Sequence, residues 1–348
     1  MCDILQIQVN DVMTKVTWDV KDWKDVSNLS AFDNKLLTKW ANAVKNGYFR
    51  YKLNIQGSAV VPGKWRFFKE LNVERGESRR KPQEFYSVNQ PFNAALFNFT
   101  RIRDEEILFQ IKMNEALGNS ESQVNDYIAI NVSPLCEGHC LILPCVEKMH
   151  PQALTQYSIE MTLCLLLQSS SPTLRIAFNS LCGAASVNHL HLHCLYVTKP
   201  MILEYLDLEV FEGPCYQMVN YPARGFVFQG SADSPDDLKS VARNVFKLTS
   251  FLHSQNEAHN VTMTRSKLSE SDKYLAYFRV YVWVRKPVVG AKVMSGFNPA
   301  ALELFGYFTF KNEELYKNAE EKFLCDVLED MTHEPFERNY EKIKQLFG

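Results

Sequence analysis

A short stretch at residues 186–197 has the most distinctive pattern in the chain, because histidines alternate there with apolar side chains. His189, His191 and His193 are spaced by two residues, which is the side-chain period of a β-strand. Their imidazoles are expected on one face of a strand, with the intervening apolar side chains directed into a core. Burial of apolar surface does not explain why three of the eight histidines gather here, so this face is predicted to carry chemistry.

The pattern of the first half predicts mainly strands, with one long helix between them. Apolar runs bounded by turn residues indicate strands, whereas apolar residues at intervals of three and four indicate a helix. The expected elements, in order, are strands at 97–100, 106–109, 127–132 and 139–143, a helix ending near 168, a strand at 174–178, a loop at 179–188 and the histidine strand.

The second half repeats this order of elements. The pattern predicts a strand at 225–229, a helix from Ser234 through Leu252, strands at 260–263 and 277–284, and C-terminal helices, the last opening at Pro335. Helix, strand, loop and strand therefore occur twice, about 90 residues apart, which indicates a duplication. Only the first copy has histidines in its final strand.

The predicted organisation has three parts. Residues 1–56 form a peripheral N-terminal segment with one helix capped by Asp33, residues 57–215 a catalytic half, and residues 216–348 a second half of the same fold without the triad. A chain of 348 residues is long enough for two such halves with a substantial core.

Composition and charge narrow the classes of partner and compartment. The net charge of −2 gives no reason to expect nucleic acid or an anionic membrane as a partner. The N-terminus lacks the pattern of a secretory signal, and the longest tight apolar run, 163–167, is far shorter than the roughly 20 residues of a transmembrane helix. Nine scattered cysteines suit a reducing compartment, so a cytoplasmic protein is expected.

Three imidazoles on one face are compatible with three kinds of site. A metal site needs a further ligand, and no Cys-x-x-Cys or His-Glu-x-x-His pattern supplies one. The loose group of Cys136, His139, Cys140 and Cys145 is better interpreted as buried residues in and beside a hairpin. A purely structural polar network is costly to bury. Nucleophilic catalysis at phosphorus is the third possibility, since a neutral imidazole attacks near pH 7 and departs again once phosphorylated.

The loop before the histidine strand strengthens the case for phosphoryl chemistry. Residues 179–186 offer the Asn179 side chain, the Ser186 hydroxyl and backbone N–H groups at small residues, among them Gly183. Such groups donate hydrogen bonds to the charge on a transferring phosphoryl group. The loop is therefore predicted to bind phosphate oxygens.

A basic, loop-like stretch lies upstream, at residues 57–97. It includes Arg75, Arg79 and Arg80, whose guanidinium groups match phosphate in geometry. Charge alone allows two interpretations of these arginines, a solvated surface or a wall that faces phosphate groups.

Together these residues resemble a known superfamily. The His-Leu-His-Leu-His stretch at 189–193, with the small-residue loop before it and the hairpin at 133–144, is similar to the signature region of the histidine-triad nucleotidyl hydrolases and transferases. More narrowly, the chain resembles the animal GDP-D-glucose phosphorylase family and its plant relative, the GDP-L-galactose phosphorylase family. The stretches that carry this narrower resemblance are 72–80, 97–100, 130–134, 186–191, 225–228 and 297–300.

The resemblance implies both a fold and a reaction. The fold would be α+β, a duplicated histidine-triad-like fold with antiparallel sheets, flanking helices and a galactose-1-phosphate-uridylyltransferase-like architecture. His191 would attack the α-phosphorus of a GDP-hexose, release hexose 1-phosphate and hold GMP until inorganic phosphate removes it as GDP. His189 would orient His191, and His193 would contact phosphate or assist the leaving group. No metal or other cofactor is expected, and a homodimer is compatible with the resemblance because related folds often pair.

Three positions depart from the relatives, and two further functions stay open. The plant phosphorylases and the uridylyltransferases have Gln in place of His193, while Cys182 and Cys145 stand where the superfamily often has Gly and a basic residue. A histidine-triad hydrolase that uses water as the acceptor is one alternative, since the acceptor depends on how the closed pocket admits phosphate. A non-catalytic nucleotide-binding protein is the other, although an intact triad argues against a decayed site.

Overall fold

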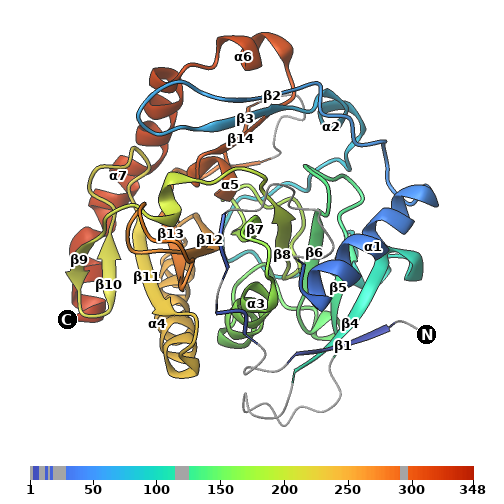
Figure 1. Cartoon of the computed structure of the whole chain (residues 1–348), viewed down its shortest axis with the longest axis horizontal. Helices are drawn as coiled ribbons and strands as arrows, with labels where there is room; N and C mark the ends of the chain where they lie inside the picture. The colour runs from blue at the N-terminus through green and yellow to red at the C-terminus, as the bar shows by residue number, and fades with distance from the viewer. Residues whose placement is uncertain (1–2, 8–11, 15, 19–28, 114–124, 291–296) are drawn as a thin grey trace.

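The computed structural model describes residues 3–7, 12–14, 16–18, 29–113, 125–290 and 297–348 (Figure 1). Within these ranges the chain folds around a large sheet, with two long helices on one face and a small second sheet on the other (Figure 1). None of the helices in this part of the chain combines the length and the apolar character needed to cross a membrane.

Eleven strands of the described residues form the large sheet and three form the small one. Among these strands, β1 pairs in parallel with β4 and β14 in parallel with β3, while the other pairs are antiparallel. The order across the large sheet is β1 (Asp3–Ile7), β4 (Ile107–Met113), β5 (Asp126–Ile130), β6 (Cys140–Leu143), β8 (Leu192–Tyr196), β7 (Leu174–Asn179), β12 (His259–Ser266), β13 (Tyr277–Val284), β11 (Phe226–Ser231), β10 (Cys215–Gln217) and β9 (Glu209–Glu212). The order across the small sheet is β14 (Tyr307–Phe310), β3 (Phe68–Leu71) and β2 (Gly57–Val60).

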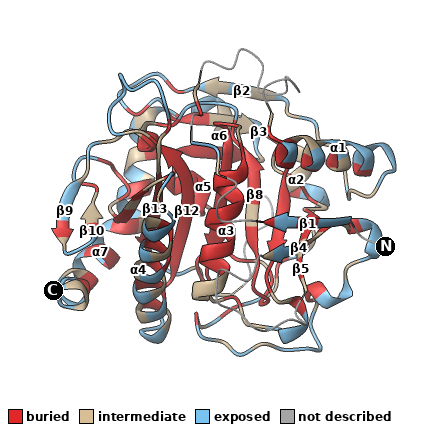
Figure 2. Cartoon of the chain, turned by 60° about the horizontal axis from the view of Figure 1, so that its bottom comes forward, coloured by how far each residue is buried: buried red, intermediate tan, exposed pale blue. Residues whose placement is uncertain are grey.

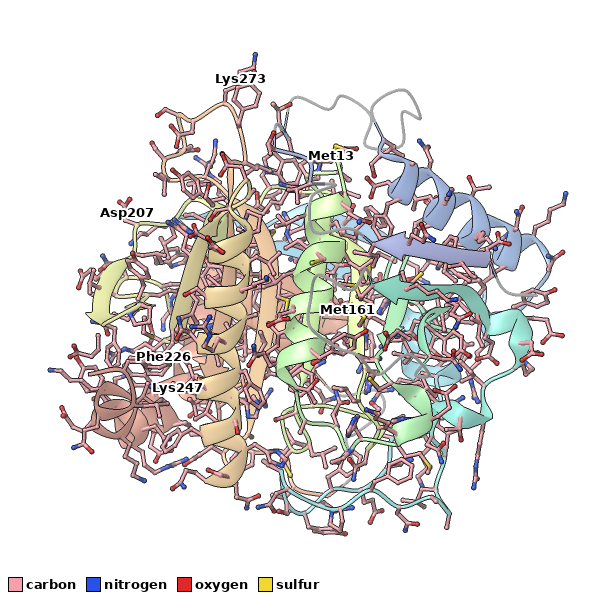
Figure 3. All side chains as sticks on the ribbon, turned by 90° about the horizontal axis from the view of Figure 1, so that it is seen from below. Met13, Met161, Asp207, Phe226, Lys247 and Lys273 are labelled. Carbon is pink, nitrogen blue, oxygen red and sulfur yellow. The ribbon has the colours of Figure 1, made fainter. Side chains whose placement is uncertain are left out.

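Two helices, α3 (Gln156–Gln168) and α4 (Pro235–Ser254), lie side by side over one face of the large sheet (Figure 3). Almost every side chain of α3 is buried, whereas α4 keeps one side exposed to solvent (Figure 2). The main hydrophobic core lies under these helices and includes Leu190, Leu192 and Cys194, the apolar residues that alternate with the histidines. The predicted alternation of the histidine stretch is therefore confirmed on its apolar side.

The small sheet and several helices cover the opposite face. This layer contains α2 (Val73–Ser78), α5 (Ala301–Leu304) and α6 (Glu313–Asn318). The long α7 (Glu321–Phe347) places Leu324 and Leu328 in the core of this layer but Phe336 and Ile343 in the main core. Helix α7 therefore packs against both faces at one edge of the large sheet (Figure 1).

The repeated order of elements is present in the large sheet. Elements β6, α3, β7 and β8 follow one another in the first half, and β11, α4, β12 and β13 in the second. Across the sheet they run β6-β8-β7 and then β12-β13-β11, so the two copies are arranged in opposite order and meet where β7 pairs with β12. The fold is α+β and duplicated, as predicted, and the seam between its copies lies one strand away from β8.

Two strand predictions near the histidines are wrong in detail. Residues 97–100 do not form a strand, because the Asn98 side chain caps a 3-10 helix at Phe99–Arg101 by accepting from the N–H of Thr100. Strand β8 begins only at Leu192, so His189 and His191 lie in the segment that leads into it.

Helix positions and the N-terminal segment also differ from expectation. Ser30, not Asp33, caps α1 (Ala31–Lys45), while the buried Asp33 carboxylate accepts from the hydroxyl groups of Ser30 and Tyr196. Pro335 lies inside α7 and does not open a helix. The boundaries at residues 56 and 215 stay predictions, and packing crosses both, since α1 contributes to the main core and β3 pairs with β14.

Breaking the buried ion pair between Arg175 on β7 and Glu204 should be strongly destabilising, because neither side chain has contact with water and the remaining charge would stay buried. Glu204→Gln would leave a buried guanidinium charge without its carboxylate. We expect the free energy of unfolding, measured with denaturant, to fall by about 3–5 kcal/mol. As a control, Glu313→Gln breaks the exposed pair with Lys317 on α6 and should change the free energy of unfolding by less than about 1 kcal/mol. Equal effects of the two substitutions would contradict this account.

Candidate active site

A cavity that is open at its mouth lies on the face of the large sheet opposite α3 and α4. We call it the histidine cavity, because His191 and His193 line it. The first half also contributes side chains from the stretches 75–81 and 177–187, and the second half contributes the stretch 298–311. The histidines thus come from one half, but the cavity is completed by both.

Two sets of hydrogen bonds fix the position and the protonation of His191. The side chain of Gln152 accepts from the N–H of His191 (2.9 Å) and donates to its carbonyl oxygen (3.1 Å), which anchors the backbone. Nδ1 of His191 lies 2.7 Å from the carbonyl oxygen of His189, a group that can only accept, so Nδ1 carries a proton. In a neutral ring the lone pair then lies on Nε2, which is the atom available to react.

His189 orients His191, but through its backbone and not through its ring. The His189 side chain is fully buried, is not among the residues that line the cavity, and accepts from the N–H of Phe99 through Nδ1 (3.0 Å). Burial lowers the pKa of His189 to about 4, so its ring is neutral at ordinary pH. The ring also packs against Phe92 and Phe99, which fixes the first histidine as part of the wall behind His191.

A fourth histidine, His139, sets the tautomer of His193. The N–H of Leu135 donates to Nδ1 of His139 (2.9 Å), and burial holds the pKa of His139 well below its usual range, so the neutral ring carries its proton on Nε2. That Nε2–H lies 3.0 Å from Nδ1 of His193 and donates to it. The Asn131 amide, 3.2 Å from the same Nε2, cannot also donate there, because a neutral imidazole has one acceptor nitrogen. The neutral ring of His193 therefore carries its own proton on Nε2, as a donor at the cavity wall.

Asn179 and Ser186 lie where the sequence predicted them, in the cavity lining. Oδ1 of Asn179 accepts from the Asn260 side chain (2.7 Å) and from the N–H of Ala301 (3.0 Å). These two bonds fix the amide across the seam between the halves, so the NH₂ group is what Asn179 can offer to a ligand. Ser186 is half-buried and presents a hydroxyl to the same space.

Gly183 has a different role from the one expected. It is not among the lining residues, and its N–H donates to the carbonyl oxygen of Ser180 (3.0 Å) inside the loop. A Cβ at this position would lie 2.5 Å from Oγ of Ser180 and 2.7 Å from the carbonyl oxygen of His259, so a larger residue does not fit. Gly183 therefore shapes the loop against β12, and its N–H is not available to phosphate. Cys182 beside it adopts φ of 55°, the left-handed region that favours glycine.

The structure places all three predicted arginines in the lining of the histidine cavity. Arg75 donates to the carbonyl oxygen of Ser133, and the guanidinium of Arg80 lies 3.2 Å from the centre of the Phe97 ring. Burial lowers the pKa of Arg79 and that of Arg80 to about 10, which leaves both charged at neutral pH. Their position in the cavity lining favours the prediction that these arginines face phosphate groups over the prediction of a solvated surface.

Sequence reasoning missed several residues of this site. His139 was interpreted as one of a group of small buried residues, and no pattern pointed to Gln152, Glu303 or Lys311. A signal existed only for His139, which lies in the strand predicted to pair within the upstream hairpin. In the described ranges, no group of three or more His, Cys, Asp or Glu side chains is arranged to hold a metal ion.

The sequence matches family models along most of its length. The GDPGP1-like N-terminal domain matches residues 31–195 and the GDPGP1-like C-terminal domain residues 213–348. GDP-D-glucose phosphorylase 1 of Danio rerio is 35% identical over 334 residues, which cover 94% of this chain and 93% of that protein. The Homo sapiens protein of the same name is 36% identical, with 86% and 79% covered. GDP-L-galactose phosphorylase 2 of Arabidopsis thaliana is 28% identical, with 88% and 74% covered.

Solved structures share the fold. Yeast Ap4A phosphorylase Apa2 superposes with a TM-score of 0.59 at 15% sequence identity, over 87% of this chain and 94% of that chain. Its complex with Ap4A gives a TM-score of 0.58 at 16% identity. At such identities the similarity concerns the fold alone, and it agrees with the duplicated α+β architecture predicted from the sequence.

Removal of the hydrogen bond from His139 to His193 should slow catalysis without unfolding the protein. His139→Phe keeps an aromatic ring in the buried position but removes the donor to His193, so we expect kcat to fall by about 10- to 100-fold with little change in KM. His139→Gln retains an N–H donor and should recover part of the rate. Steady-state kinetics with thermal unfolding as a check of folding measure both. Unchanged kcat in a folded His139→Phe variant would contradict the role of His139 in setting the tautomer of His193.

Proposed function

The chain belongs to the GDPGP1-like family, and from this membership we propose that it is a GDP-hexose phosphorylase that converts GDP-D-glucose and inorganic phosphate into glucose 1-phosphate and GDP. Animal relatives named GDP-D-glucose phosphorylase 1 match most of the chain and support GDP-glucose as the substrate. The plant relatives named GDP-L-galactose phosphorylase support GDP-hexoses as the wider substrate class. Such an enzyme would control the cellular level of GDP-glucose.

One observation carries the proposed reaction type, the hydrogen bond from Nδ1 of His191 to the carbonyl oxygen of His189. It leaves the lone pair on Nε2 of a ring that lines the cavity. In the first step Nε2 attacks the α-phosphorus of GDP-glucose, and the bond from that phosphorus to the bridging oxygen breaks. Glucose 1-phosphate departs with the bonding electrons, and the guanylyl group stays on Nε2.

The surrounding groups support this step electrostatically. Once guanylylated, the His191 ring is positively charged, and the carbonyl oxygen of His189 accepts from its Nδ1–H. The Nε2–H of His193, the amide of Asn179 and the hydroxyl of Ser186 are donors for the charge on the phosphoryl oxygens. Such groups are fixed by the fold before substrate arrives, so they need little reorganisation during the reaction.

The second step reverses the first with a different acceptor. An oxygen of inorganic phosphate attacks the α-phosphorus, the bond to Nε2 of His191 breaks, and the electrons return to the ring. GDP is released and the free enzyme is restored. Nucleotide, sugar phosphate and phosphate are thus the partners that this scheme requires, with no cofactor among them.

Two finer expectations belong to the same proposal. The cytoplasm is the compartment we propose, supported by the eight described cysteines, which are unpaired. The homodimer stays a prediction from the resemblance to related folds. Both are independent of the chemistry at His191.

His191→Asn removes the nucleophile while preserving a small polar side chain. Release of glucose 1-phosphate from GDP-glucose and phosphate should fall by about 10⁴-fold or more, because the imidazole that forms the covalent intermediate in this mechanism is lost. His333→Asn on α7 replaces an exposed histidine and should leave turnover unchanged. Turnover by His191→Asn at the rate of the unaltered protein would overturn the mechanism. If neither the unaltered protein nor His333→Asn converts any of several GDP-hexoses, the proposed function is overturned.

A further inference from the structure

A group of cationic side chains lines the histidine cavity. These residues are far from His191 in the sequence and belong to other structural elements. Lys311 follows β14 of the small sheet, whereas Arg75 belongs to α2 and Arg79 follows it directly. All three line the same cavity as His191 and His193, which the large sheet supplies. The cavity therefore has a nucleophilic wall from one sheet and a cationic wall from the other layer.

Backbone pairing brings the cations together. Strand β14 pairs in parallel with β3, and the N–H of Asn72, just after β3, donates to the carbonyl oxygen of Phe310 (2.8 Å). The Asn72 side chain then caps α2 by accepting from the N–H of Arg75 (3.2 Å). Asn72 thus connects the end of β14, which Lys311 directly follows, to the start of α2.

A glycine permits the close approach of Lys311 to α2. A Cβ on Gly76 would lie 3.2 Å from Cβ and 3.7 Å from Cδ of Lys311, so the lysine stem lies against the helix at this position. Gly76 is the residue after Arg75 and precedes Arg79 by three positions, about one helical turn. The Lys311 stem therefore lies against α2 at a residue next to Arg75 in sequence and three positions before Arg79.

The charges of the cavity are not balanced by its own carboxylates. Five lining side chains are cationic and two are carboxylates, Glu106 and Glu303. Glu106 is already paired with Arg103 at 2.9 Å. Glu303 is buried, which raises its pKa, and it accepts from the N–H groups of Ala300 and Thr309. The lining side chains together therefore carry a net positive charge, which favours an anionic ligand.

Crowding of these cations is unfavourable in the empty cavity. Burial and, to a smaller extent, the neighbouring charges of Arg79 and Arg75 together lower the pKa of Lys311 to about 7, while the Glu303 carboxylate acts in the opposite direction. Like charges held together in a partly buried site repel each other, and a bound polyanion would relieve that repulsion. An arrangement that weakens the free protein in this way is typical of a ligand site.

We propose that Arg75, Arg79 and Lys311 form a second anion site in the histidine cavity, which holds the phosphate group that is not bonded to His191. This inference rests on the proposed phosphorylase function and assigns the residues that bind its acceptor, inorganic phosphate. In the first step the site would bind the β-phosphate of the GDP-hexose, which leaves as part of hexose 1-phosphate. In the second step it would bind inorganic phosphate, which attacks the same α-phosphorus from the same position.

The site accounts for the choice between phosphate and water. The leaving phosphate and the attacking phosphate occupy equivalent positions, because the second displacement is the reverse of the first. Three cations stabilise a phosphate dianion but give no advantage to neutral water. The same guanylyl-histidine would give GDP when phosphate attacks and GMP when water attacks, so the ratio of these products measures the site directly.

The test is the ratio of GDP to GMP formed from GDP-glucose at a subsaturating phosphate concentration. Lys311→Met keeps the length of the side chain and removes its charge, and we expect the ratio to fall by about 10- to 100-fold, the usual effect of one charge-assisted contact. Lys311→Arg keeps the charge and should retain most of the ratio. Lys317→Met, on the exposed face of α6, is the matched control and should behave like the unaltered protein. Because both products derive from one intermediate, the ratio does not depend on how fast that intermediate forms.

A second measurement keeps the proposal open to refutation if turnover of the Lys311→Met variant is too slow to follow. Inorganic phosphate alone should raise the unfolding temperature of the unaltered protein, and should raise that of Lys311→Met less. An unchanged product ratio in Lys311→Met, or an equal phosphate-induced shift in both proteins, would overturn the second anion site while leaving the phosphorylase function intact. Failure of the unaltered protein to release any glucose 1-phosphate would instead overturn the function itself.

Discussion

The hydrogen bond between Nδ1 of His191 and the carbonyl oxygen of His189 is the constraint on which the site depends. It decides which nitrogen of the ring has the lone pair and therefore which atom can attack. The bond forms only if the backbone of 189–191 is held in place, and Gln152 holds it by two further hydrogen bonds. The buried ring of His189 supports the same segment from behind through Phe99. In the proposed mechanism the triad is therefore one nucleophile with its backbone support, and not three equivalent bases.

The rest of the fold places charges and donors around that one atom. Asn179 lies at the end of β7, at the seam between the duplicated copies, and is fixed by Asn260 and Ala301 of the second half. The second half also supplies Lys311 through the small sheet. The half without histidines thus completes the cavity and carries part of its positive charge.

Much of the fold and the centre of the site could be predicted from the sequence, because those features depend on patterns among residues that are close together in the chain. The period of two at 189–193 predicts that the apolar residues alternating with the histidines point into a core, and burial of Leu192 and Cys194 confirms this, although the strand itself begins only at Leu192. What could not be predicted depends on contacts between distant segments. His139 and His193 are 54 positions apart, and only their 3.0 Å contact shows that one sets the tautomer of the other. Gly183 was misplaced for a similar reason, since its surroundings include β12, which no local pattern relates to the loop.

The central claim is that His191 carries the guanylyl group between two displacements. The most direct test is to mix the protein with GDP-glucose in the absence of phosphate, quench within one turnover under conditions that preserve phosphorus–nitrogen bonds, and determine the mass of the intact protein and of its peptides. The account predicts a mass increase of one guanylyl group, located on His191 and lost on addition of phosphate with formation of GDP. A protein that releases glucose 1-phosphate only when phosphate is present, with no guanylylated peptide at any time, would contradict it.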